Sequence, residues 1–310
     1  MSRAILVTGA TGKQGGAVIN TLIRNNAGFR ILALTRDVNS RSARRLAAKS
    51  PHVKLVQGNL SDPEGIFAAA KAATTAPIWG VFSVQVAIGF AQGDAEFTQG
   101  RDMIDASVKA GVQHFIYSSV DRHGSASIDN PTNIPHFIHK HNIEKHLIES
   151  TKNGEMSWTI LRPVAFMENF TNNFFGRVFA TTWRIAVKEK PLQLIAVPDI
   201  GIMAAKAFLS PEEYKNRAIS LAGDELTIEK ASQIFKKHTG RDLPWANRLI
   251  CNLIMWSMKD FGYMFRWFYN VGYGADIEEV KKIHPDVKDF ETWLVTDSEF
   301  ANEIKARQAH

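Results

Sequence analysis

Short apolar runs alternate with amphipathic segments through the first half of the chain. The runs predict buried strands at residues 4–7, 30–34, 53–56, 78–82, 114–117 and 158–161. Helical spacing of apolar residues fills the gaps, as with Val18 and Leu22 in the first of them. Asp62 followed by Pro63 is typical of an N-cap that opens a helix, here through residue 73. Strands that alternate with helices in this way indicate parallel βα units, so we expect a Rossmann-type, doubly wound parallel α/β sheet.

The alternation ends near Pro163. Aromatic residues are frequent from there to residue 179, and the pattern then predicts a strand over 192–197 and helices over 199–209 and 227–238. We therefore expect a main domain over residues 1–162. The rest, residues 163–310, is expected to form a smaller, mostly helical region interleaved with the last strands of the main sheet. Residues 245–273, dense in Trp, Met, Phe and Tyr, fit either the core of this region or an exposed patch for a protein partner.

Composition narrows the class of protein. Of the 310 residues, 45% are hydrophobic and 22% are charged, which is ordinary for a globular chain and excludes disorder as the dominant state. No run of about 20 apolar residues predicts a membrane span. Lys and Arg number 37 against 31 Asp and Glu, and the basic residues are scattered. This modest positive charge is compatible with a phosphate-bearing small molecule, whereas direct binding of nucleic acid is not expected.

The single cysteine, Cys251, excludes an intramolecular disulfide and a cysteine metal cluster, which favours a reducing compartment. The first residues lack a signal-peptide pattern, so we expect the mature chain to begin near Met1 and to reside in the cytoplasm, with the nucleus as an additional location. His139, His141 and His146 lack the spacing of a metal site, and we expect them to decorate a polar helix face. No metal is expected.

A glycine-rich segment follows the first predicted strand directly and opens a helix. It consists of Gly9, Ala10, Thr11, Gly12, Lys13, Gln14 and Gly15. In such a turn the first glycine permits the tight bend, the second lets the backbone approach a pyrophosphate, and the third lets helix and strand pack closely. The helix N-terminus then holds the anion. The context predicts a dinucleotide-binding turn, so residues 1–162 are expected to be an NAD(P)-binding domain.

The end of the second predicted strand bears on which nicotinamide cofactor binds. NAD-binding chains usually carry an acidic residue there for the ribose hydroxyls, whereas a cation accommodates the 2′-phosphate of NADP. Here Arg36 follows the strand, and Arg41, Arg44 and Arg45 lie on the next segment. The pattern favours NADP(H). Because Asp37 follows Arg36, NAD remains the alternative.

Two further loops of the predicted sheet are candidates for cofactor contacts. Asn59 and Leu60 follow the third strand, where this fold usually touches adenine, and Ser83, Val84 and Gln85 follow the fourth, along the expected path of the diphosphate and ribose. Both assignments rest only on the position of these loops in the expected fold. The alternative is that these are ordinary βα loops.

Several segments together resemble the NmrA-like family, an atypical branch of the short-chain dehydrogenase/reductase superfamily. They include the glycine-rich segment, the turn at Arg36, residues 56–62, 136–140, 162–170, 220–227, 264–268 and 293–294. The resemblance spans residues 5–294, and the segments after residue 162 are the more specific ones. It implies a Rossmann-type fold that binds NADP(H).

The resemblance also raises the question of catalysis. Short-chain reductases usually place a tyrosine four residues before a lysine, and the phenol delivers a proton. Lys140 stands at the lysine position, but His136 replaces the tyrosine, while Ser118 and Ser119 occupy the place of the superfamily's serine. The resemblance implies that Lys140 is a cofactor ligand. It is catalytic only if the chain is an enzyme, with His136 as a candidate acid.

The resemblance implies further contacts at the nicotinamide end of the cofactor. Ala165 and Phe166 are expected to lie closest to it, with Glu168 and Asn169 bordering the cleft. The phenylalanines that follow fit a substrate wall or an aromatic core equally well.

Two functions follow as hypotheses. The first is an NADP(H)-binding redox sensor that passes the cofactor's state to a regulatory protein partner. The second is an NADPH-dependent reductase of a small carbonyl or enone compound.

Overall fold

The structure is a computed structural model that describes residues 3–85 and 94–308. It contains two compact units, called here the sheet unit and the C-terminal unit. The sheet unit comprises Met1–Val120, Ile138–Arg162 and Pro198–Ile219. The C-terminal unit comprises Asp121–Phe137, Pro163–Val197 and Ser220–His310. The expected domain boundary between residues 162 and 163 stays a prediction.

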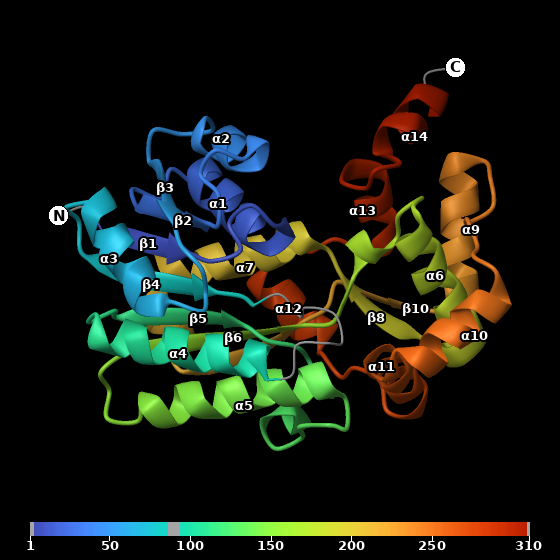
Figure 1. The fold of residues 1–310 in the computed structure, drawn as a ribbon. Coiled ribbons are helices and arrows are strands. Elements are labelled where there is room, and N and C mark those ends of the chain that lie inside the picture. Colours follow the sequence, from blue (N-terminus) through green and yellow to red (C-terminus); the bar gives the residue numbers. More distant parts are fainter. Residues whose placement is uncertain (1–2, 86–93, 309–310) are drawn as a thin grey trace. The chain divides into compact units, whose positions relative to one another are not determined.

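A seven-stranded sheet forms the core of the sheet unit (Figure 1). Its strands are β1 (Ala4–Val7), β2 (Arg30–Thr35), β3 (Val53–Gln57), β4 (Ile78–Ser83), β5 (His114–Ser118), β6 (Ser157–Pro163) and β9 (Arg217–Leu221). The order is β3-β2-β1-β4-β5-β6-β9, and every pair from β3 to β6 is parallel. The order reverses between β1 and β4. The expected Rossmann-type, doubly wound sheet is thereby confirmed.

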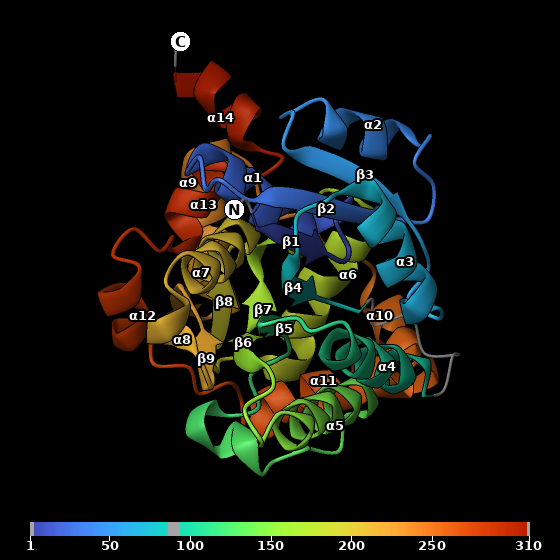
Figure 2. The same cartoon turned by 90° about the vertical axis from the view of Figure 1, so that its left-hand side faces the viewer.

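Helices cover both faces of this sheet. They are α1 (Lys13–Arg24), α2 (Arg41–Ala47), α3 (Pro63–Ala73), α4 (Ala95–Lys109), α5 (Pro135–Ser150), α7 (Val197–Leu209) and α8 (Pro211–Tyr214). One face packs on α3, α4 and α5, where Phe67, Met103 and Ile143 join a continuous apolar core. Helices α1 and α7 cover the opposite face (Figure 2), and α7 packs on α1 at Gly201 and Ala17.

The helix α3 starts as its sequence predicts. The carboxylate of Asp62 accepts a hydrogen bond from the Gly65 N–H at 3.0 Å, and Pro63 occupies the first helical position. A proline there loses no intrahelical hydrogen bond. The helix ends at Ala73, as expected.

The C-terminal unit contains a small sheet and most of the remaining helices. Strand β8 (Leu192–Ile195) pairs parallel with β7 (Ala165–Phe166) and antiparallel with β10 (Asp224–Leu226). The helices are α6 (Phe174–Thr182), α9 (Ile228–Thr239), α10 (Arg248–Ser257), α11 (Lys259–Asn270), α12 (Ile277–Ile283), α13 (Phe290–Thr296) and α14 (Ala301–Gln308). Short helical turns are η1 (Gly124–Ile128), η2 (Met167–Asn169) and η3 (Trp183–Val187). Within the described ranges, every helix is too short or too polar to cross a membrane.

The predicted strand over residues 192–197 is too long. The strand ends at Ile195, because the Val197 N–H donates to the carboxylate of Glu168 and Val197 begins α7. Apolar residues continue across this junction, so the sequence alone does not mark it.

The aromatic stretch over 245–273 turns out to be divided between interior and surface. Phe265 and Trp267 of α11 are buried, whereas Leu253 and Trp256 of α10 are 59% and 78% exposed. Part of this stretch thus belongs to the core, whereas a protein partner at the exposed residues of α10 stays a prediction.

Candidate functional site

The turn between β1 and α1 has the shape that its glycines predict. Gly9 has a φ of 57°, in the left-handed region that favours glycine. A Cβ on Gly15 would lie 2.4 Å from the Gly9 carbonyl oxygen and 2.6 Å from that of Thr8. The N-terminus of α1 is therefore pressed against the end of β1. A side chain at position 15 would separate the two.

The turn leaves room for an anion at the start of α1. Gly12 is the N-cap residue and has no side chain with which to cap the helix. The first amide groups of a helix need an acceptor from outside the helix, and a phosphate is a suitable one. The end of β4 lies beside the turn, since the Val84 N–H donates to the Thr8 hydroxyl at 2.8 Å. This is the point where the strand order reverses.

Gln85 presents an unused acceptor close to this point. Its Nε2 donates to the Ser83 hydroxyl at 2.9 Å. Its Oε1 is buried and has no hydrogen-bond partner among residues 3–85 and 94–308. A buried carbonyl oxygen without a donor is costly, so this atom suits a ligand that brings a hydroxyl group.

Arg36 and Asp37 at the end of β2 have different surroundings. The Asp37 carboxylate accepts the N–H of Asn39 at 2.8 Å and so closes a local turn. Arg36 is exposed, and its guanidinium has no partner in the described part of the chain. The same is true of the side chains of Arg41, Arg44 and Arg45 in and beside α2. The arginines are therefore available to an anion, whereas one oxygen of the carboxylate already accepts a hydrogen bond.

The loop after β3 is partly occupied by its own hydrogen bonds. The Asn59 Oδ1 accepts the N–H of Ser61 at 3.1 Å, and Leu60 packs against the apolar core. Asn59 itself is exposed at the carboxyl end of β3. That places it at the same edge of the parallel sheet as the glycine-rich turn.

Lys140 is held by an acidic residue that the sequence analysis missed. Its Nζ lies 2.9 Å from Oε1 of Glu96 in the first turn of α4, with the two side chains 11% and 7% exposed. The ammonium also lies 5.9 Å from the centre of the Tyr117 ring. Nothing in the sequence pairs these residues, because they lie 44 positions apart with the complete strand β5 in between. The expectation for Lys140 as a cofactor ligand stays a prediction.

The two serines after β5 donate their protons to other side chains. The Ser118 hydroxyl donates to Oε1 of Gln14 at 2.6 Å. The Ser119 hydroxyl donates to Glu144, whose carboxylate also pairs with Arg162 at 2.7 Å. Both hydroxyls are therefore already committed inside the sheet unit.

The histidines of α5 differ from one another. His139 lies 3.4 Å from Asp94, the N-cap residue of α4, and His146 lies 2.7 Å from Asp105 within that helix. His141 is buried, so its expected place on a polar helix face is wrong. The face of α5 that carries His141 packs inward, which its even mixture of polar and apolar residues conceals.

His136 forms a carboxylate pair within the C-terminal unit. Its Nδ1 lies 2.6 Å from Oδ1 of Asp260 at the start of α11, and the two side chains are 20% and 17% exposed. The neighbouring Phe137 ring packs edge-on against both His136 and Trp267. The imidazole is therefore fixed in orientation by the adjacent Phe137 and by Asp260, which lies 124 positions away in sequence.

The remaining expected residues also lie in the C-terminal unit. Ala165 and Phe166 form β7, followed by Glu168 and Asn169 in η2. The Glu168 carboxylate accepts the Val197 N–H at 3.0 Å and the Trp293 Nε1–H at 3.1 Å. Glu168 thus has a clear structural role. Of the phenylalanines that follow, Phe170 is buried and Phe175 is 80% exposed.

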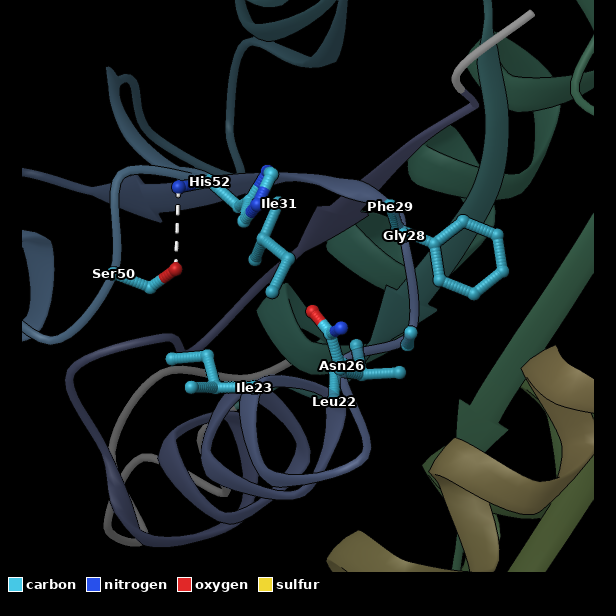
Figure 3. Close-up of a pocket in the computed structure, with 9 residues that line it drawn as sticks. Leu22, Ile23, Asn26, Gly28, Phe29, Ile31, Ser50 and His52 are labelled. Carbon is cyan, nitrogen blue, oxygen red and sulfur yellow. Dashed lines mark hydrogen bonds between the residues drawn. The ribbon is translucent and has the colours of Figure 1, made fainter.

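A separate pocket of the sheet unit contains none of the expected site residues. Figure 3 shows Ile23 and Asn26 at the end of α1, with Phe29 and His52 across from them. These residues stand at the amino ends of β2 and β3, whereas the glycine-rich turn follows the carboxyl end of β1. Ligands of open parallel sheets bind at the carboxyl ends of the strands. The pocket is therefore not a candidate for the cofactor.

The glycine-rich turn at the reversal point of a doubly wound sheet defines a Rossmann-type α/β protein. The NmrA-like family matches residues 1–294, and the chain belongs to this family.

Curated relatives are similar over most of their length. The NmrA-like family domain-containing oxidoreductase hkm9 of Aspergillus hancockii is 27% identical over 77% of this chain and 73% of the relative. An NmrA-like family domain-containing protein of Dictyostelium discoideum is 24% identical over 79% and 80%.

Solved structures share the fold at low sequence identity. NmrA, a negative transcriptional regulator solved in complex with NADP, superposes with a TM-score of 0.67 at 18% identity, covering 99% of this chain and 98% of the other. Triphenylmethane reductase of Citrobacter sp., complexed with NADP(H), gives 0.70 at 19% identity, covering 93% and 98%. Proteins that share this fold therefore include a transcriptional regulator and a reductase.

Proposed function

We propose that this protein binds NADP(H) and reports the redox state of the cofactor to a regulatory protein. The observation that carries the choice of cofactor is the contrast at the end of β2. Arg36 is exposed without an acidic partner in the described chain, while the carboxylate of Asp37 is engaged by Asn39. A guanidinium suits the 2′-phosphate of NADP, whereas one oxygen of the carboxylate is already used in a local turn.

The sheet unit fits a dinucleotide at two other places. Gly9, Gly12 and Gly15 form a turn with an open helix N-terminus for the diphosphate, and the buried Oε1 of Gln85 lacks a donor among the described residues. Lys13, Gln14, Asn59, Val84 and Lys140 complete the proposed contacts from this unit. The proposed contacts from the C-terminal unit are Ala165, Phe166, Glu168 and Asn169.

Sensing is favoured over turnover by the state of the residues that usually catalyse. Position 136 is a histidine, Ser118 and Ser119 donate to other side chains, and the charge of Lys140 is balanced by Glu96. The solved NmrA structure, a transcriptional regulator in complex with NADP, supports the same choice. We place this function in the cytoplasm or the nucleus, in keeping with the single cysteine.

The proposal is tested by calorimetric titration of the full chain with NADP⁺, NADPH, NAD⁺ and NADH. We expect the NADP pair to bind more tightly than the NAD pair, and a difference of about tenfold between NADP⁺ and NADPH, as a sensor requires. Arg36→Ala is expected to weaken both forms of NADP by about 1.5–3 kcal/mol and to leave NAD nearly unchanged. Arg30, at the other end of the same strand, provides the control as Arg30→Ala. Equal binding of NADP and NAD by the wild type would contradict the choice of cofactor.

A second function, NADPH-dependent reduction of a small carbonyl compound, is favoured by the pair of His136 and Asp260. A carboxylate on Nδ1 fixes the orientation of the imidazole and leaves Nε2 as the candidate proton donor. NADPH supplies a hydride when bound. Several curated relatives are named oxidoreductases, which supports this candidate.

Turnover of aldehydes, quinones and enones separates the two functions. If the chain is a reductase, His136→Gln should abolish cofactor oxidation while the affinity for NADPH stays nearly unchanged. Asp260→Asn should reduce the rate by about 10²-fold or more. Rates that do not respond to either substitution would exclude His136 as the acid.

A further inference from the structure

Glu96 and Lys140 form a nearly buried ion pair. Lys140 is one of the proposed cofactor contacts, but Glu96 has no part in them. The two atoms are 2.9 Å apart, and the helices that carry them, α4 and α5, lie side by side on one face of the sheet (Figure 1). Met103 of α4 and Ile143 of α5 share the same apolar core, so the helices hold the pair in register. Burying two charges costs solvation energy that their attraction only partly returns. A pair of this kind is therefore weak evidence of a purely stabilising role.

The pair lies at the carboxyl edge of the sheet. The ammonium of Lys140 is 5.9 Å from the ring of Tyr117, the residue next to the end of β5. The adjacent residue, Ser118, reaches Gln14 of the glycine-rich segment at 2.6 Å. Lys140 and the turn are thus linked through two consecutive residues of one strand. The pair belongs to the edge where ligands of such sheets bind.

Oxidised and reduced nicotinamide differ by one positive charge on the ring. An unpaired ammonium nearby would disfavour the oxidised ring, and a carboxylate beside the ammonium cancels most of that repulsion. The charge of the pair as a whole therefore influences which form binds better.

We propose that Glu96 determines the preference of this site between NADP⁺ and NADPH by balancing the charge of Lys140. The inference rests on the proposed function, since it requires Lys140 to face the cofactor. Glu96 is then a specificity-determining residue that need not touch the cofactor. Its negative charge favours NADP⁺, whose nicotinamide ring is positively charged, relative to NADPH, so the ratio of the two affinities depends on it.

The test varies the charge of the pair with shape nearly constant. Glu96→Gln leaves a net charge of +1, Lys140→Met leaves −1, and the double variant leaves zero, as in the wild type. For each, the dissociation constants of NADP⁺ and NADPH are measured by calorimetry and their ratio is compared. We expect the dissociation constant of NADP⁺ divided by that of NADPH to rise by about three- to tenfold in Glu96→Gln. In Lys140→Met this ratio should fall. The double variant should return close to the wild-type ratio.

The ratio separates this inference from other effects. A lost hydrogen bond between Lys140 and the cofactor weakens both redox forms together, and a purely structural pair lowers the melting temperature without changing the ratio. A ratio that is the same in all four proteins would overturn the inference and leave NADP(H) binding intact. Failure of the wild type to bind either form would instead overturn the proposed function. If Glu96→Gln does not fold, Lys140→Met and the double variant still allow the ratio to be compared between net charges of −1 and zero.

Discussion

The Ser118 hydroxyl donates to Oε1 of Gln14 at 2.6 Å, and this bond joins the end of β5 to the first turn of α1. The strand and the helix are separated by 104 positions in sequence. A residue at the place of a superfamily serine therefore holds the glycine-rich turn against the sheet. Its proton is unavailable to a substrate as long as this bond persists.

Replacement of Ser118 distinguishes a structural role, in which it holds the turn against the sheet, from a role in proton transfer. Ser118→Ala should lower the free energy of unfolding by about 1 kcal/mol, because the amide oxygen of Gln14 loses its donor. It should weaken NADPH binding only a few-fold and leave any reductase activity at a similar level. Denaturant unfolding and calorimetry measure both effects. A loss of activity without a loss of affinity would show that Ser118 transfers a proton after all.

Gly15 and Gly16 offer a matched pair for the turn. A Cβ at position 15 would lie 2.4 Å from a backbone oxygen, whereas one at position 16 would have its nearest neighbour at 3.5 Å. Gly15→Ala should cost about 1–3 kcal/mol of stability and abolish dinucleotide binding, since α1 must move from β1. Gly16→Ala should bind the cofactor nearly as well as the wild type. Similar affinities in the two variants would argue that the turn does not contact the diphosphate.

His114 should make the stability depend on pH. Burial lowers the pKa of His114 to about 4, a shift only partly opposed by Glu212, and both ring nitrogens lie near hydroxyl groups. The unfolded chain binds the proton near pH 6.5, so the folded state loses stability as pH falls from about 6.5 towards 4. The loss from this residue alone should reach about 3 kcal/mol. Above pH 7 it should vanish.

Chemical denaturation of the wild type and of His114→Asn between pH 4 and 7.5 checks this dependence. The variant should show a smaller slope in that interval, whatever its stability at pH 7. Parallel curves for the two proteins would show that other groups cause the acid lability.

The pair of Glu144 and Arg162 should be important for stability. Their carboxylate and guanidinium are 2.7 Å apart, with side chains 1% and 5% exposed. Glu144→Gln leaves a buried charge unpaired, and we expect a loss of about 3–5 kcal/mol. Glu64→Gln, which breaks an exposed pair with Lys109, is the control and should leave the melting temperature almost unchanged. Thermal unfolding of both variants decides the matter.

The sequence predicts the elements of the sheet unit closely, because their causes are local. Apolar runs define the strands, Asp62 and Pro63 define the start of α3, and the glycines define the turn after β1. The pairs of Glu96 with Lys140 and of His136 with Asp260 are not predictable in this way. Each joins side chains from helices distant in sequence, and only the tertiary packing brings them together.

The junction after β8 shows a different limit of prediction from the sequence. Apolar residues continue from the strand into α7, so periodicity alone extends the strand by two residues. The actual boundary depends on Glu168, a residue that precedes the junction by nearly thirty positions. Resemblance to a family assigned that glutamate to the cofactor cleft, whereas its contacts here show an additional role at the helix start.

The alternation of the chain between its two units limits how the gene can be divided. The sheet unit takes its residues from three separate stretches, the last of which carries α7 and begins β9. A truncated gene that ends at residue 162 would therefore encode a sheet without its edge strand β9 and without α7, one of the two helices over one of its faces. Neither unit can be transferred to another protein as one continuous cassette, so recombination would have to exchange the two together.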